Sequence, residues 1–144
     1  MGLIGAAGLG SAAGCGAFAG APEPQPHPLE GFIADTLALA DRYGATIAAV
    51  PDLATMLTPI RDAHLAHAEA LAAATGVELP AASDPGEGGS VPSAPQLALR
   101  ALATAEAEAR DAAVTECLAA GSWIAPLLGA IAAARSCHLE VMRP

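Results

Sequence analysis

The chain has 144 residues, enough for one domain, and its formal net charge at pH 7 is −9. Ala and Leu dominate and aromatic residues make up only 3%, a composition that favours helices over sheets. All six basic residues are Arg and stand singly along the chain, so no basic stripe is present that could bind the phosphates of a nucleic acid.

Residues 1–15 have the features of an export signal. The segment has no charged residue, and its apolar run Leu3–Leu9 leads to Ala12-Ala13-Gly14-Cys15. Small residues before a Cys resemble the bacterial lipobox, after which the signal is cleaved and the Cys receives a lipid. The positive n-region of a signal peptide is missing. We predict a lipoprotein-type signal over 1–15 with lipidation of Cys15, which places the protein in the cell envelope at the outer face of the cytoplasmic membrane; another cleaved signal or a plain anchor is the alternative.

Residues 16–28 are predicted to form a spacer. Proline occupies every second position from Pro22 to Pro28. This spacing excludes helix and favours an extended polyproline-like chain. Such a segment is suited to hold a folded domain away from a membrane-attached Cys15.

Helical periodicity predicts four helices in residues 29–142. We expect them to span residues 29–50, 53–75, 94–121 and 122–142. Asp52 is the expected N-cap of the second helix and Ser93 that of the third, while Gly76 ends the second. The expected buried face of the first helix consists of Ile33, Leu37, Ala40, Gly44 and Ile47, widened by Phe32, Leu39 and Tyr43.

The lengths of the connections predict how these helices are joined. The first and second are joined tightly, as are the third and fourth, so each pair is expected to be an antiparallel hairpin. The linker over 76–94 is rich in Pro and Gly and is long enough to run the whole length of a bundle. Two hairpins joined by one long crossover form the ferritin-like arrangement, whereas an up-down bundle with a long loop is the alternative.

Three of the predicted helices have polar residues on the face that should be apolar. These faces are Leu53, Leu57, Ile60, His64, His67 and Leu71; Leu99, Leu102, Glu106, Ala109, Ala113 and Cys117; and Ile124, Leu128, Ile131, Arg135, His138 and Met142. In a hairpin that turns near residue 121, Glu106 lies beside Arg135 and His138. We therefore predict a polar core cluster of His64, His67, Glu106, Arg135 and His138, because buried polar groups must satisfy one another or hold a metal.

Three stretches of the chain carry a family resemblance: Pro51-Asp52-Leu53, the run Arg61–His67, and the run Ala125–His138. They resemble the ferritin-like superfamily, and more narrowly a family of actinobacterial exported lipoproteins with a ferritin-like domain of unknown function. Diiron carboxylate bundles place one Glu on each of two helices and Glu-x-x-His on each of the other two. His64-x-x-His67 and Arg135-x-x-His138 occupy the two Glu-x-x-His positions, and Glu106 occupies one of the single-Glu positions. The other single-Glu position falls near Asp35 and Asp41.

Two Glu of the diiron set are thus replaced, by His64 and by Arg135. An Arg cannot ligate a cation, and iron of the diiron type requires several carboxylates. We expect a buried Arg135–Glu106 pair hydrogen-bonded to His138 and flanked by the other two His, with no cofactor. The alternative is a divalent metal site made by His64, His67, Glu106 and His138, with Zn²⁺ or Cu²⁺ favoured over iron.

No set of catalytic residues stands out, so the favoured function is a non-catalytic one: a lipid-anchored bundle that binds an unknown protein or small molecule. A metal-binding or redox ferritin-like protein and a structural homo-oligomer are the alternatives. Cys117 and Cys137 are expected to be free, buried thiols, because the hairpin separates them by roughly 18 Å along its axis.

Overall fold

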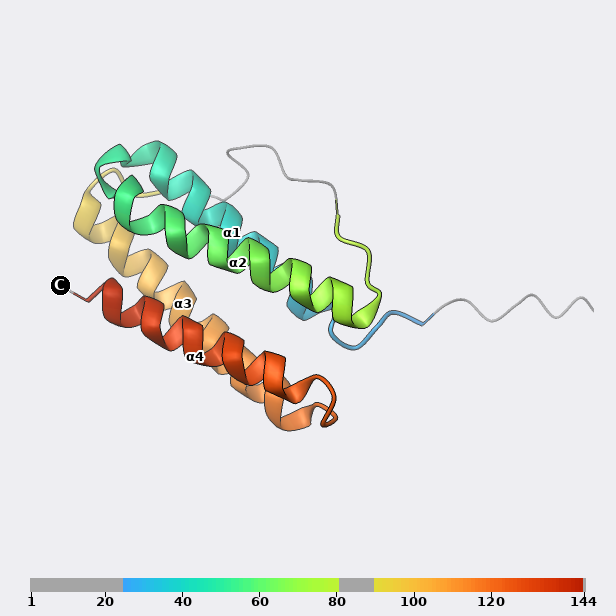
Figure 1. Cartoon of the computed structure of the whole chain (residues 1–144). Coiled ribbons are helices and arrows are strands. Elements are labelled where there is room, and N and C mark those ends of the chain that lie inside the picture. Colours follow the sequence, from blue (N-terminus) through green and yellow to red (C-terminus); the bar gives the residue numbers. More distant parts are fainter. Residues whose placement is uncertain (1–24, 81–89, 144) are drawn as a thin grey trace, which may run out of the picture.

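The computed structural model describes residues 25–80 and 90–143, so Cys15, the predicted signal segment and most of the predicted spacer lie outside the described residues. Within these ranges the chain forms four α-helices, one short 3₁₀ turn and no strand. The helices are α1 (Glu30–Ala49), α2 (Ala54–Thr75), α3 (Pro95–Ala119) and α4 (Ala125–Val141), and the 3₁₀ turn η1 is Pro51–Leu53 (Figure 1). The predicted all-α four-helix bundle is confirmed. No helix in the described part of the chain is long and apolar enough to cross a membrane.

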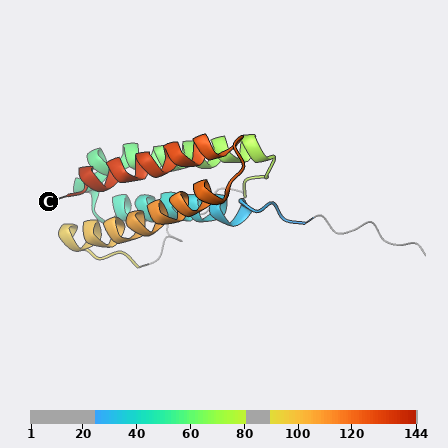
Figure 2. The same ribbon diagram turned by 90° about the horizontal axis from the view of Figure 1, so that it is seen from below.

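The helices pack as two hairpins lying side by side. α1 packs along α2 and α3 packs along α4, each pair antiparallel, as Figure 1 and Figure 2 show. The hairpins meet where α1 contacts α3 and where α2 contacts α4. In both views α2 ends at the opposite end of the bundle from the start of α3. The connection from Thr75 to Pro95 therefore leads from one end of the bundle to the other, and α2 and α3 run in the same direction.

Two predicted side-chain caps are wrong. α2 begins only after η1, with Leu53 as its N-cap and no side-chain cap, so Asp52 lies inside the 3₁₀ turn. The N-cap of α3 is Ala94, again without a side-chain cap, so Ser93 does not fill that role. In both places main-chain carbonyls accept the first N–H groups, because Leu53 N–H bonds to Val50 O and Leu97 N–H bonds to Ala94 O.

The buried face of α1 differs from the predicted one. Leu37, Gly44 and Ile47 are only partly buried, whereas Thr36 and Thr46 point inward. The Oγ1 atoms of Thr36 and Thr46 each donate a hydrogen bond of 2.8 Å to a carbonyl one turn earlier in the same helix. These bonds offset the cost of burying a hydroxyl, and hydropathy periodicity does not register them.

The left-handed C-cap of α2 leads to a prediction for stability. Gly76 has φ of 75° and no heavy atom within 4 Å of a Cβ built on it, so backbone strain alone opposes a side chain there. Gly76→Ala is expected to lower the free energy of unfolding by about 1 kcal/mol. The matched control is Gly31→Ala on α1, which also has open space around its Cβ but no positive φ; it should stabilise the protein by about 0.5–1 kcal/mol. Urea unfolding of both variants checks this, and equal effects of the two substitutions would contradict it.

Cys117 and Cys137 are free thiols, as predicted. Only Cys117 is partly buried, and its Sγ lies 3.3 Å from Ala125 O across the α3–α4 hairpin. Cys137 is exposed, so its predicted burial is wrong. Cys137 directly precedes His138 on α4, and the helical rotation of about 100° per residue turns its side chain away from the inward face to solvent.

Candidate functional site

A group of polar side chains, one from each helix, lies in the middle of the bundle. We call Tyr43, His64, Glu106 and His138 the His–Glu centre. Apolar clusters flank it on both sides along the bundle, one of them including Ile33, Leu71, Leu128 and Ile131, the other including Leu57, Ile60, Leu102 and Met142. Tyr43, His64 and Glu106 are 0% exposed, and the His138 side chain is 13% exposed.

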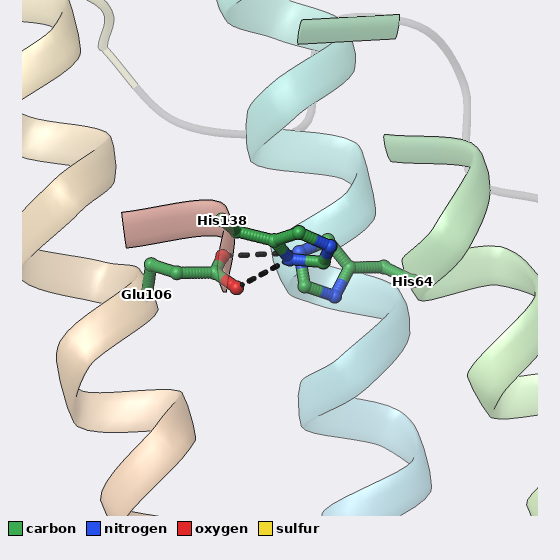
Figure 3. Close-up of side chains that lie close together, drawn as sticks. All are labelled: His64, Glu106 and His138. Atoms are coloured by element: carbon green, nitrogen blue, oxygen red, sulfur yellow. Dashed lines mark hydrogen bonds and ion pairs between the residues drawn. The ribbon is translucent and has the colours of Figure 1, made fainter. Parts of the chain in front are cut away.

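Glu106 is the acceptor on which the His–Glu centre converges. Tyr43 donates its hydroxyl hydrogen to Oε2 at 2.8 Å, and His64 Nε2 lies 3.0 Å from the same oxygen. His138 Nδ1 lies 2.9 Å from Oε1, and Figure 3 shows the two His rings approaching the carboxylate together. Because an ionised Glu106 can only accept, His64 donates from Nε2 and His138 from Nδ1.

These contacts keep the buried carboxylate charged. Burial by itself raises the pKa of Glu106, but the hydrogen bonds from His138, His64 and Tyr43 favour the anion and outweigh it, so the pKa is lowered from 4.5 to about 2. For Tyr43, burial and the adjacent Glu106 charge both raise the pKa of the phenol far above 10.0. Tyr43 is therefore a neutral donor at every physiological pH.

Tyr43 is the member of the centre that sequence reasoning missed. Its position on the inward face of α1 was expected, but as an apolar core residue. Two features could have predicted that Tyr43 bonds to Glu106. It lies on α1 at the height of Glu106, and a buried phenol needs a hydrogen-bond partner. The acids considered for this helix are not in the centre, since Asp35 is exposed and Asp41 only partly buried.

Arg135 is buried, as predicted, but among the described residues it forms no ion pair with Glu106. Its Nη1 donates to Ala109 O at 2.7 Å and its Nη2 to Thr36 Oγ1 at 2.8 Å. The guanidinium also stacks over Phe32, 5.1 Å from the ring centroid. The expected direct pair is wrong because Tyr43 and two His already occupy both carboxylate oxygens. Burial lowers the pKa of Arg135, and the charge of Glu106 opposes that shift. The two charges therefore attract each other without direct contact.

His67 lies beside the centre but does not reach Glu106. Its ring centroid is 6.3 Å from that of His64, and its Nδ1 is buried without a hydrogen-bond partner in the described residues. Burial, together with the neighbouring His64 and Arg135, lowers the pKa of His67 from 6.5 to about 4. His67 is therefore neutral at pH 7.

Three of the four proposed metal ligands converge. One ligand atom from each of His64, Glu106 and His138 lies within 4.8 Å of the others, and His67 is not part of this group. In a tetrahedral Zn²⁺ site the ligand atoms are about 3.3 Å apart, so small side-chain shifts would suffice. A diiron site does not fit, because Glu106 is the only buried carboxylate in the described residues. The donor set, with two imidazoles and one carboxylate, suits a single Zn²⁺, Cu²⁺ or Fe²⁺ ion.

Fold and site together define the chain as an all-α four-helix bundle with a buried carboxylate held by two His and one Tyr. Comparisons with models of protein families, with curated proteins and with solved structures found no match. The resemblance to the ferritin-like superfamily therefore stays a prediction from the sequence.

Proposed function

We propose that the protein is a non-catalytic binding protein built on a ferritin-like bundle, in which the position of a diiron centre has become a structural centre. Export and attachment to the membrane through a lipid on Cys15 belong to the same proposal and rest on the sequence alone. The end-to-end connection between α2 and α3 supports the ferritin-like topology.

The observation that carries this proposal is the way charge is compensated around Glu106. All four helices contribute to its surroundings, and each carboxylate oxygen already has a donor. Arg135, one helical turn from His138, supplies a positive charge in the same buried region. A divalent ion would add two positive charges to a region where the charges of Glu106 and Arg135 already cancel, at a high cost in desolvation. The centre is therefore best suited to hold the two hairpins together.

A single-metal site is the second candidate, and one observation favours it. Arg135 points toward Thr36 and Ala109 instead of Glu106, so the guanidinium does not block the space between His64 and His138. In this candidate His64 Nε2, His138 Nδ1 and a Glu106 oxygen hold the ion, which would supply Lewis-acid or redox chemistry.

Metal analysis separates the two candidates. Protein purified without added metal is expected to contain less than about 0.1 equivalent of Zn, Cu or Fe per chain, with a melting temperature unchanged by a chelator. About one equivalent, combined with destabilisation by the chelator, would overturn the structural role. In that case His138→Ala should abolish metal retention, whereas His67→Ala, outside the converging group, should leave it intact.

A further inference from the structure

A hollow of about 350 Å³ lies on the seam between α1 and α3, outside the His–Glu centre. Residues of α1 and α3 form its walls, with apolar surface from Phe32, Leu39 and several Ala. Arg135 reaches this lining from α4, so a buried guanidinium forms part of the surface that the hollow presents. Its volume is in the range of pockets that hold small molecules.

Arg135 carries an unused donor. It is only 1% exposed, and its Nε has no hydrogen-bond partner among the described residues. Its other two nitrogens donate to the neutral oxygens of Ala109 and Thr36. No carboxylate in the described part of the chain lies within ion-pair distance of the guanidinium. Glu106 and Asp35 act on the Arg135 charge from a distance but do not bond to it, so a carboxylate that binds the guanidinium directly would satisfy the donor that is left over.

Three more charged side chains line the hollow: Asp35 and Arg42 on α1, and Glu108 on α3. All three are free of ion pairs with any residue the structure describes, and they do not neutralise one another. Among the other described Arg residues, Arg61 pairs with Asp62 and Arg110 with Asp111, whereas Arg100 has no ion pair either. The hollow is therefore lined by two cations and two anions; Asp35, Arg42 and Glu108 are exposed, whereas Arg135 is buried.

We propose that this hollow binds a small zwitterion, an α-amino acid with an apolar side chain. The ligand carboxylate pairs with Arg135 and Arg42, its ammonium group with Asp35 or Glu108, and its side chain packs on Phe32 and Leu39. A simple carboxylate is disfavoured because Asp35 and Glu108 would repel it, and a simple amine because it leaves Arg135 unpaired. This inference names a ligand for the binding role proposed above and does not depend on whether a metal binds.

Calorimetric titration of the full chain with L-leucine at pH 7 tests the proposal. We expect a dissociation constant below about 1 mM. The analogues 4-methylpentanoate, which lacks the ammonium group, and 3-methylbutan-1-amine, which lacks the carboxylate, should each bind at least about tenfold more weakly.

Variants locate the site. Ala38→Trp fills the hollow from an exposed position on α1 and should abolish binding without lowering the melting temperature. Arg42→Gln should weaken binding about tenfold or more, whereas Arg100→Gln, an exposed Arg of α3 outside the hollow, is the matched control and should have no effect. Absence of L-leucine binding at about 10 mM, equal binding of either analogue, or full binding by Ala38→Trp would overturn the proposal. Metal retention in the analysis described above would overturn the structural role of the centre without altering this result.

Discussion

Glu106→Ala is expected to lower the free energy of unfolding at pH 7 by about 3–5 kcal/mol. The substitution removes the acceptor of Tyr43, His64 and His138 at once and leaves Arg135 without the one buried charge that compensates it. It also opens a cavity at a fully buried position. Urea unfolding followed by circular dichroism measures the loss.

Two further variants make this result interpretable. Glu108→Ala removes an exposed carboxylate from the same helix and should change stability by less than about 0.5 kcal/mol. Glu106→Gln keeps the shape and one acceptor oxygen, so it should lose less stability than Glu106→Ala. If Glu106→Ala is as stable as Glu108→Ala, the His–Glu centre does not hold the hairpins together.

Acidification is expected to destabilise the protein by about 3 kcal/mol through Glu106 alone. The pKa of this carboxyl is 4.5 in the unfolded chain and about 2 in the folded protein. The unfolded state therefore binds the proton more readily, so the stabilisation is complete above pH 4.5 and is lost as the pH falls toward 2. Urea midpoints measured at pH values across this window give the size of the effect.

His67 adds a second, smaller loss at higher pH. Its pKa is 6.5 unfolded and about 4 folded, so the unfolded state again binds the proton more readily, and stability falls as the pH drops from 6.5 through 4. Partial exposure of His67 to solvent reduces this effect. His67→Asn should flatten the higher-pH part of the profile, and Glu106→Gln the part between pH 4.5 and 2. If the stability of Glu106→Gln falls between pH 4.5 and 2 as much as that of the unsubstituted protein, this carboxyl does not control acid unfolding.

Sequence reasoning succeeded where one helix face carries a strong pattern. The inward direction of His64, Glu106 and Arg135 follows from steps of three and four residues, and all three are buried. It failed where a hydrogen bond decides the outcome. Thr36 and Thr46 are buried because their hydroxyls bond to their own helix, and Asp52 and Ser93 do not cap because main-chain carbonyls serve instead.

The sequence by itself determined the four helices, their pairing into hairpins and the inward direction of His64, Glu106 and His138, because periodicity and loop length are local properties of the chain. Only the tertiary structure decided which donors Glu106 receives and that Arg135 turns to Thr36 and Ala109. Those choices depend on the rotation of each helix about its axis and on competition among four helices for two carboxylate oxygens. Neither the rotation of the helices nor this competition can be read from the sequence of a single helix.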